Sequence, residues 1–189
     1  MTLLYQFALF LHIIGGFGLM AAITVETIGL RGLRQATQRT DALVWLGLSR
    51  SIVMRLTPSS LGLILVSGLY MVATVWGPRG WILVALGSLL LLGVIGAFGT
   101  GRRMARIGLA IGRAQGPLPA ELREMLGSPI LLMSLRVRLA IVLGVVFLMT
   151  LKPSAVASLA VIVLAVALGF LAGQIPARRG RNELRADVG

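Results

Sequence analysis

Long apolar runs separated by short charged segments dominate this sequence. The first run, residues 3–28, carries a single charged residue, Glu26, and exceeds the roughly 20 residues that a helix needs to cross the hydrocarbon core of a bilayer. A cleaved signal peptide would have a basic start and a shorter apolar core. We therefore expect residues 3–28 to remain in the protein as its first transmembrane helix.

Four more spans are expected from apolar runs with recognisable helix starts. Thr57-Pro58 and Ser128-Pro129 each place a capping hydroxyl before a proline at the first helical position. The sequence thus predicts an all-α transmembrane bundle of about five spans within residues 1–176. The expected spans are residues 3–28, 58–76, 81–100, 129–151 and 154–175.

Charged segments separate pairs of these spans. In residues 41–56, apolar positions recur at three- and four-residue spacing after a capping Asp41, which favours an amphipathic helix in the cytoplasmic membrane interface. Residues 101–126 are expected to form a second basic loop that ends in a short helix at 121–126. Residues 177–189 are expected to form a basic cytoplasmic tail.

Composition and charge support a membrane protein and fix its expected orientation. Apolar residues make up 57% of the chain, and the mean hydropathy is +0.95. The net charge of +12 comes from two basic loops and the tail, whereas Arg79 and Lys152 alone lie on the other side. This is the positive-inside pattern, so we expect an outside N-terminus, a cytoplasmic C-terminus and no nucleic acid partner. With no cysteine, disulfides and thiolate metal sites are excluded.

His12 is the single histidine and lies within the first span. An intramembrane ionisable residue is a candidate functional group, so His12 can be a ligand of haem b or of copper, with Met71 at similar depth as a second ligand. Equally, a neutral imidazole can serve only as a hydrogen-bonding group between helices. The spread of the other methionines along the chain argues against a methionine copper site.

Glu26 is the one acid within a span, and Arg136 and Arg138 lie inside the apolar run that begins at Pro129. An ion pair between Glu26 and one of these arginines, within the membrane or at its inner interface, fits their depth. In the alternative, both arginines extend to phospholipid headgroups and Glu26 faces water.

Small residues predict faces where helix backbones approach closely. Gly169 and Gly173 form a GxxxG pattern, the signature of tight packing within a chain or of a homodimer. The candidate packing glycines are Gly15, Gly16, Gly93, Gly96, Gly169 and Gly173.

Three short segments together resemble a known group of proteins: Phe10 to Gly16, Pro58 to Gly68, and the glycine-rich run from Trp81 to Arg102-Arg103. The chain resembles bacterial predicted integral membrane proteins of unknown function that are loosely similar to the copper-resistance D type. This resemblance implies a bacterial inner-membrane location and, through His12, a haem or metal link.

Three classes of function remain open. A non-enzymatic membrane subunit or scaffold, with other membrane subunits as partners, accounts for the scarcity of polar residues within the spans. A haem- or metal-binding protein that uses His12 is the second class. A small transporter is the third, although a pathway normally needs polar groups at every depth. No two residues stand in a recognisable catalytic relation, so no enzyme is expected.

Overall fold

A computed structural model describes residues 2–174 and shows an all-α protein over that range. Five stretches of helix are long and apolar enough to cross a membrane, which confirms the predicted class and number of candidate spans. The α-helices are α1 (Leu3–Gln35), α2 (Arg39–Met71), α3 (Gly80–Ile95), α4 (Arg102–Arg113), α5 (Ala120–Gly127), α6 (Pro129–Leu151) and α7 (Ala155–Gln174). Two π-helical segments, η1 (Val72–Trp76) and η2 (Gly96–Gly101), extend α2 and α3.

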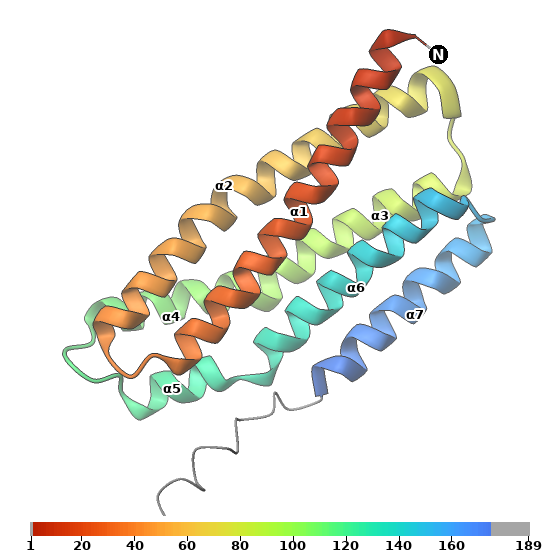
Figure 1. Cartoon of the computed structure of the whole chain (residues 1–189). Helices are drawn as coiled ribbons and strands as arrows, with labels where there is room; N and C mark the ends of the chain where they lie inside the picture. Colours follow the sequence, from red (N-terminus) through yellow and green to blue (C-terminus); the bar gives the residue numbers. More distant parts are fainter. Residues whose placement is uncertain (1, 175–189) are drawn as a thin grey trace, which may run out of the picture.

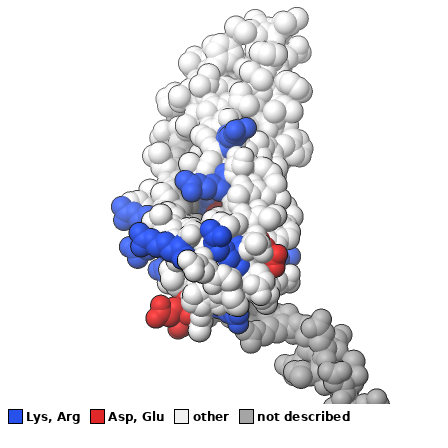
Figure 2. All heavy atoms as spheres, turned by 90° about the vertical axis from the view of Figure 1, so that its left-hand side faces the viewer, with Lys and Arg blue, Asp and Glu red and all other residues white. Residues whose placement is uncertain are grey.

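The helices form two groups that run side by side (Figure 1). One group is the α1–α2 hairpin, and the other contains α3, α6 and α7. We call the end where η1 turns into α3 and α6 turns into α7 the tryptophan end, and the end with α4, α5 and the α1–α2 connection the arginine end. On the face in Figure 2, charged residues gather over the lower half of the molecule, which includes the arginine end.

The predicted helix start at Thr57-Pro58 is wrong, because Pro58 lies inside the continuous helix α2. Proline lacks the N–H that would bond the carbonyl four residues earlier, and its ring crowds that carbonyl. The helix nevertheless continues, with the Ser59 hydroxyl donating to the Arg55 carbonyl at 2.8 Å in the loosened turn. Packing against α1 along its length overrides the local signal.

The segment 41–56, predicted as a separate interfacial helix, is therefore the first half of α2. Its first turns do not lie flat on the bundle surface: Ala42 is fully buried, and the Trp45 ring lies so close to Gly32 of α1 that a Cβ there would be 2.2 Å away. The face packed on α1 includes Trp45 and Ser49, whereas Leu48, which the predicted apolar face included, is 53% exposed.

The basic loop predicted at residues 101–126 also proves to be mostly helical. Here α4 continues directly from η2, and α5 matches the short helix expected at 121–126. The Arg34 Nε donates to the Leu126 carbonyl at the end of α5, at 2.7 Å, and Arg39 donates to the Ile111 carbonyl near the end of α4. The main apolar core lies around Leu19, Leu92 and Ile141. A second apolar core lies beneath the arginine end, formed around Leu33, Ile107, Ile111, Leu122, Leu126 and Leu131.

The bounds of α6 coincide with the predicted span 129–151, and α7 lies within one residue of 154–175. The absence of side chains at two glycines lets the two helices pack closely. A Cβ at Gly169 would lie 2.7 Å from the Val137 backbone, and a Cβ at Gly173 would lie 2.8 Å from the Met133 side chain. The GxxxG pattern thus serves α6–α7 packing. The predicted tail at 177–189 lies outside the described residues.

Candidate functional site

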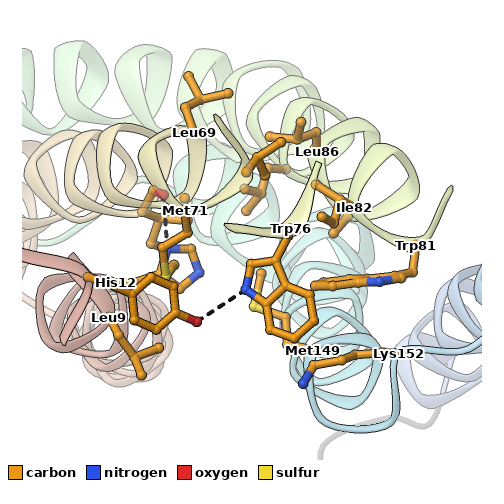
Figure 3. Close-up of a pocket in the computed structure, with 16 residues that line it drawn as sticks. Leu9, His12, Leu69, Met71, Trp76, Trp81, Ile82, Leu86, Met149 and Lys152 are labelled. Atoms are coloured by element: carbon orange, nitrogen blue, oxygen red, sulfur yellow. Dashed lines mark hydrogen bonds between the residues drawn. The ribbon is translucent and has the colours of Figure 1, made fainter. Parts of the chain in front are cut away.

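A cavity of about 420 Å³ lies at the tryptophan end, between the two helix groups. Figure 3 shows that its side chains come from both groups. Most of the lining is apolar, and its few polar groups belong to Tyr5, His12, Trp76, Trp81 and Lys152. From Tyr5 to His12 along α1 the cavity reaches about 10 Å deep, at 1.5 Å per residue. Leu9 and Leu69, on its rim, are 39% and 54% exposed, so the cavity opens sideways.

His12 is half-buried in the deeper part of the cavity, held by α2. Its Nδ1 lies 3.0 Å from the Ile64 carbonyl and 3.1 Å from the Ser67 hydroxyl. A carbonyl can only accept, and the Ser67 hydroxyl already donates to the Leu63 carbonyl, so Nδ1 must carry the proton. In the neutral ring, Nε2 therefore has a free lone pair, and no residue that the structure describes hydrogen-bonds to it.

Gly68 allows this close approach of His12 to α2. A Cβ at position 68 would lie 3.1 Å from the His12 Cε1 atom. Gly15, one turn after His12, brings the backbones together in the same way, since its Cβ would lie 2.9 Å from Ile64. The glycines around His12 thus place the imidazole against a backbone carbonyl. Gly16, by contrast, meets nothing within 4 Å and packs against no helix within the described residues.

An aromatic cluster forms the outer wall of the cavity. Trp76 and Trp81 meet edge to face with ring centroids 6.1 Å apart, and the Trp76 Nε1 donates to the Tyr5 hydroxyl at 3.1 Å. The Trp81 Nε1 is buried and has no hydrogen-bond partner within residues 2–174. Buried indole N–H groups are usually paired, so an unpaired one is an exception in this wall.

Met71 is buried and lines the same cavity as His12, so the structure brings the two predicted cofactor ligands to one site. Figure 3 shows both side chains on the same side of the cavity, away from Trp81. Over the described part of the chain, no group of three or more carboxylate and histidine side chains could hold a metal ion. Any metal here would thus rest on His12 with methionine or with ligands that the metal itself brings.

Glu26 and Arg138 form a separate polar site toward the arginine end. Their side chains lie 2.8 Å apart and are 16% and 7% exposed, so α1 and α6 are joined by a largely buried ion pair. The Arg138 Nη2 also donates to the Thr100 hydroxyl at 3.3 Å, in η2. Thr100 donates in turn to Ser134, which donates to the Ile95 carbonyl where α3 becomes η2.

The π-helical turn makes room for this network. A Cβ at Gly96, the first residue of η2, would lie 3.2 Å from the Arg138 Nη1. The wider i to i+5 bonding of η2 displaces Thr100 from the ordinary helical register. Gly93, one turn earlier, meets nothing within 4 Å, so the close approach begins only at Gly96.

Arg136, the other predicted partner of Glu26, instead donates to the Ala172 carbonyl near the end of α7. The sequence predicts no site role for Tyr5, Trp81 or Lys152, although Trp81 and Lys152 stand out by their positions beside turns. For Lys152 a signal existed, since it is the single lysine of the chain and occupies a turn. The pairing of Tyr5 with Trp76 joins residues 71 positions apart, and no local pattern reports it.

Searches of protein-family models, of curated proteins and of solved structures found no match to this chain.

Replacing Glu26 alone should destabilise the protein more than replacing both members of the ion pair. Glu26→Gln leaves the Arg138 charge buried without its counter-charge, which costs about 3 kcal/mol in buried pairs. Glu26→Gln with Arg138→Met removes the charge as well and should recover part of that loss. Thermal unfolding in detergent measures both, with Glu124→Gln, an exposed acid on α5, as control. Equal losses in the single and double variants would contradict the pairing.

Proposed function

We propose that this chain is a non-enzymatic subunit of a bacterial inner membrane, with the tryptophan end outside and the arginine end in the cytoplasm. Most basic residues of the described range lie in the segments around α4, α5 and the first half of α2, which supports this orientation by the positive-inside rule. Trp76 and Trp81 then lie at the outer headgroup level, where tryptophan is enriched.

Single cysteines test the orientation, because the chain has none of its own. Pro78→Cys lies in the exposed turn before α3, and Gln115→Cys lies in the exposed loop after α4. In intact cells, a membrane-impermeant maleimide should label position 78 and should reach position 115 only after lysis. The reverse pattern would invert the topology.

The role that the geometry supports best is the binding of a small apolar or amphipathic molecule drawn from the membrane. The cavity beside His12 carries this proposal: it holds about 420 Å³ of space, its lining is mostly apolar, and it opens past Leu9 and Leu69. Apolar cavities with a few placed polar groups are the usual form of ligand sites. Between spans, the exposed leucines face lipid, so a ligand can enter without passing through water.

An enzyme is not part of the proposal. His12 has a backbone carbonyl and a serine as neighbours, and that serine donates its proton to its own helix. A nucleophile activated by a base would need the serine proton to face the imidazole. The arrangement instead fixes the orientation of the ring, as expected of a binding group.

Filling the cavity should abolish ligand binding, and thermal unfolding checks that the fold is kept, because Ala85 also belongs to the apolar core. Ala85 is buried in the cavity wall, and Ala85→Phe would place a ring in the ligand space. Gly87→Phe on the same helix is the matched control, because position 87 is exposed and meets nothing within 4 Å. Native mass spectrometry of the purified protein should show a retained ligand in the wild type and in Gly87→Phe, and none in Ala85→Phe. Equal retention in all three would contradict the proposal.

Haem or metal binding is the second candidate, and the tautomer of His12 favours it. An imidazole that donates from Nδ1 to a backbone carbonyl and presents Nε2 is the usual arrangement of a metal-ligating histidine. Met71 lies in the same cavity and supplies a thioether for haem iron or Cu(I). The resemblance to copper-resistance D type proteins agrees with a link of this kind.

An absorption spectrum with metal analysis tests the second candidate. A haem or copper protein should lose its cofactor in His12→Ala and keep it in Ser67→Ala, which removes a neighbour of Nδ1 but leaves Nε2 in place. A Soret band or stoichiometric copper with that pattern would establish His12 as ligand. A colourless, metal-free wild type, expressed with haem precursor and copper supplied, would contradict the second candidate.

A further inference from the structure

We infer that the ligand of this cavity is an anionic phospholipid whose phosphate is held at the tryptophan end and whose acyl chain enters the space beside His12. The inference rests on the proposed binding function and adds the chemistry of the headgroup. Three features near the cavity mouth carry it: two cations on one aromatic ring, the lack of a described acid beside them, and the backbone conformation of Lys152.

Two cations lie against the Trp76 ring, and one of them, Lys152, also lines the cavity. The Lys152 Nζ lies 4.4 Å from the centroid of the Trp76 ring, and the Arg79 guanidinium carbon lies 5.4 Å from the same centroid. Figure 3 shows Lys152 beside Trp76, close to Trp81. One aromatic ring of the cavity wall thus contacts two positive charges.

No acid of the described residues neutralises these charges. The acids of the chain are Glu26, Asp41, Glu121, Glu124, Glu183 and Asp187, so none lies between positions 42 and 120 or between 125 and 182. The ion pair that the structure records within residues 2–174 is the one at the other site, between Glu26 and Arg138. At headgroup depth, the phosphate of a lipid is the abundant counter-charge for unpaired cations.

Phosphate oxygens accept hydrogen bonds from ammonium and guanidinium groups together, whereas a purely apolar ligand would leave both unused. The donor set thus fits a tetrahedral anion better than a neutral head.

The backbone conformation of Lys152 also supports an anionic ligand. With φ at 49°, it is the one residue other than glycine with a positive φ in the described range, and its N–H bonds to the Leu148 carbonyl to end α6. Glycine or asparagine suits this left-handed position, whereas a lysine suffers steric strain there. A strained conformation at a ligand site indicates that the side chain has a function.

The shape of the cavity accommodates the acyl chain. Below the cations, the wall is formed by aliphatic side chains of α2 and α3, such as Ile64 and Leu89, which lies about 12 Å below Trp81 along α3. The side opening past Leu9 lets a chain remain partly in the bilayer while its first carbons fill the cavity.

The test compares lipid headgroups on the purified protein by native mass spectrometry. Delipidated protein is mixed with equal amounts of phosphatidylglycerol and phosphatidylcholine with identical acyl chains. The wild type should retain phosphatidylglycerol in preference. Lys152→Gly removes the charge while relaxing the backbone, and Arg79→Gln removes the second charge. Each should lower the preference about three- to tenfold, within the range for one typical hydrogen bond.

Arg106→Gln, which removes an exposed charge on α4 at the other end, is the control and should keep the wild-type preference. Lys152→Arg should restore the preference that Lys152→Gly loses. The inference is overturned if Lys152→Gly binds both lipids as the wild type does, or if the wild type shows no preference.

Ala85→Phe separates the two levels of the proposal. Lipid that is retained without headgroup preference but lost in Ala85→Phe would contradict the anionic headgroup and leave the proposed binding function standing. Lipid that Ala85→Phe retains with unchanged preference lies outside the cavity, and that result overturns both.

Discussion

A charge buried among transmembrane helices must find its counter-charge inside the protein, and the Glu26–Arg138 ion pair meets this requirement between the two helix groups. Glu26 belongs to the α1–α2 hairpin and Arg138 to the group of α3, α6 and α7. The pair therefore joins the groups toward the arginine end. His12 lies 14 positions before Glu26, about 21 Å nearer the tryptophan end. There, the Tyr5–Trp76 hydrogen bond ties only α1 to η1, and the groups leave a cavity between them.

The charged side chains have different roles at the two ends of the molecule. At the arginine end, side chains such as Arg34 and Arg39 bond helix-terminal carbonyls, and a second apolar core lies beneath them, so the charges support structure. At the tryptophan end, the cations Arg79 and Lys152 rest on an aromatic ring and lack an acid within the described residues. Unused charge beside an open apolar cavity is the arrangement that a bound amphiphile would complete.

Much of the fold could be predicted from sequence because the bilayer imposes a simple rule on length and hydropathy. The rule located the apolar parts of all five spans and both bounds of α6. The local start signal at Thr57-Pro58 was misleading, because Pro58 lies inside α2. Packing on α1 outweighs the cost of the one hydrogen bond that proline removes. Residues 101–126 were predicted as a loop, although Met104, Ile107 and Ile111 recur at helical spacing and form the packed face of α4.

For the candidate sites, the sequence shows which residues are candidates but not which of them contact each other. His12 and Glu26 stand out as polar residues in apolar runs, but only the folded chain shows that Arg138, and not Arg136, faces Glu26. The cavity itself depends on Gly68, Ala85 and Trp81, whose place in the sequence resembles any other apolar position. A gap between packed helices is a property of the assembled bundle, so it cannot be predicted from the periodicity of the sequence.

Ligand binding in this cavity is tested most directly by a structure of the protein determined in lipid nanodiscs that contain anionic phospholipid. Elongated density should fill the cavity, with its head near Lys152 and its tail reaching toward His12. A cavity closed by inward movement of the Trp81 or Leu89 side chains, with no density between the helix groups, would contradict it.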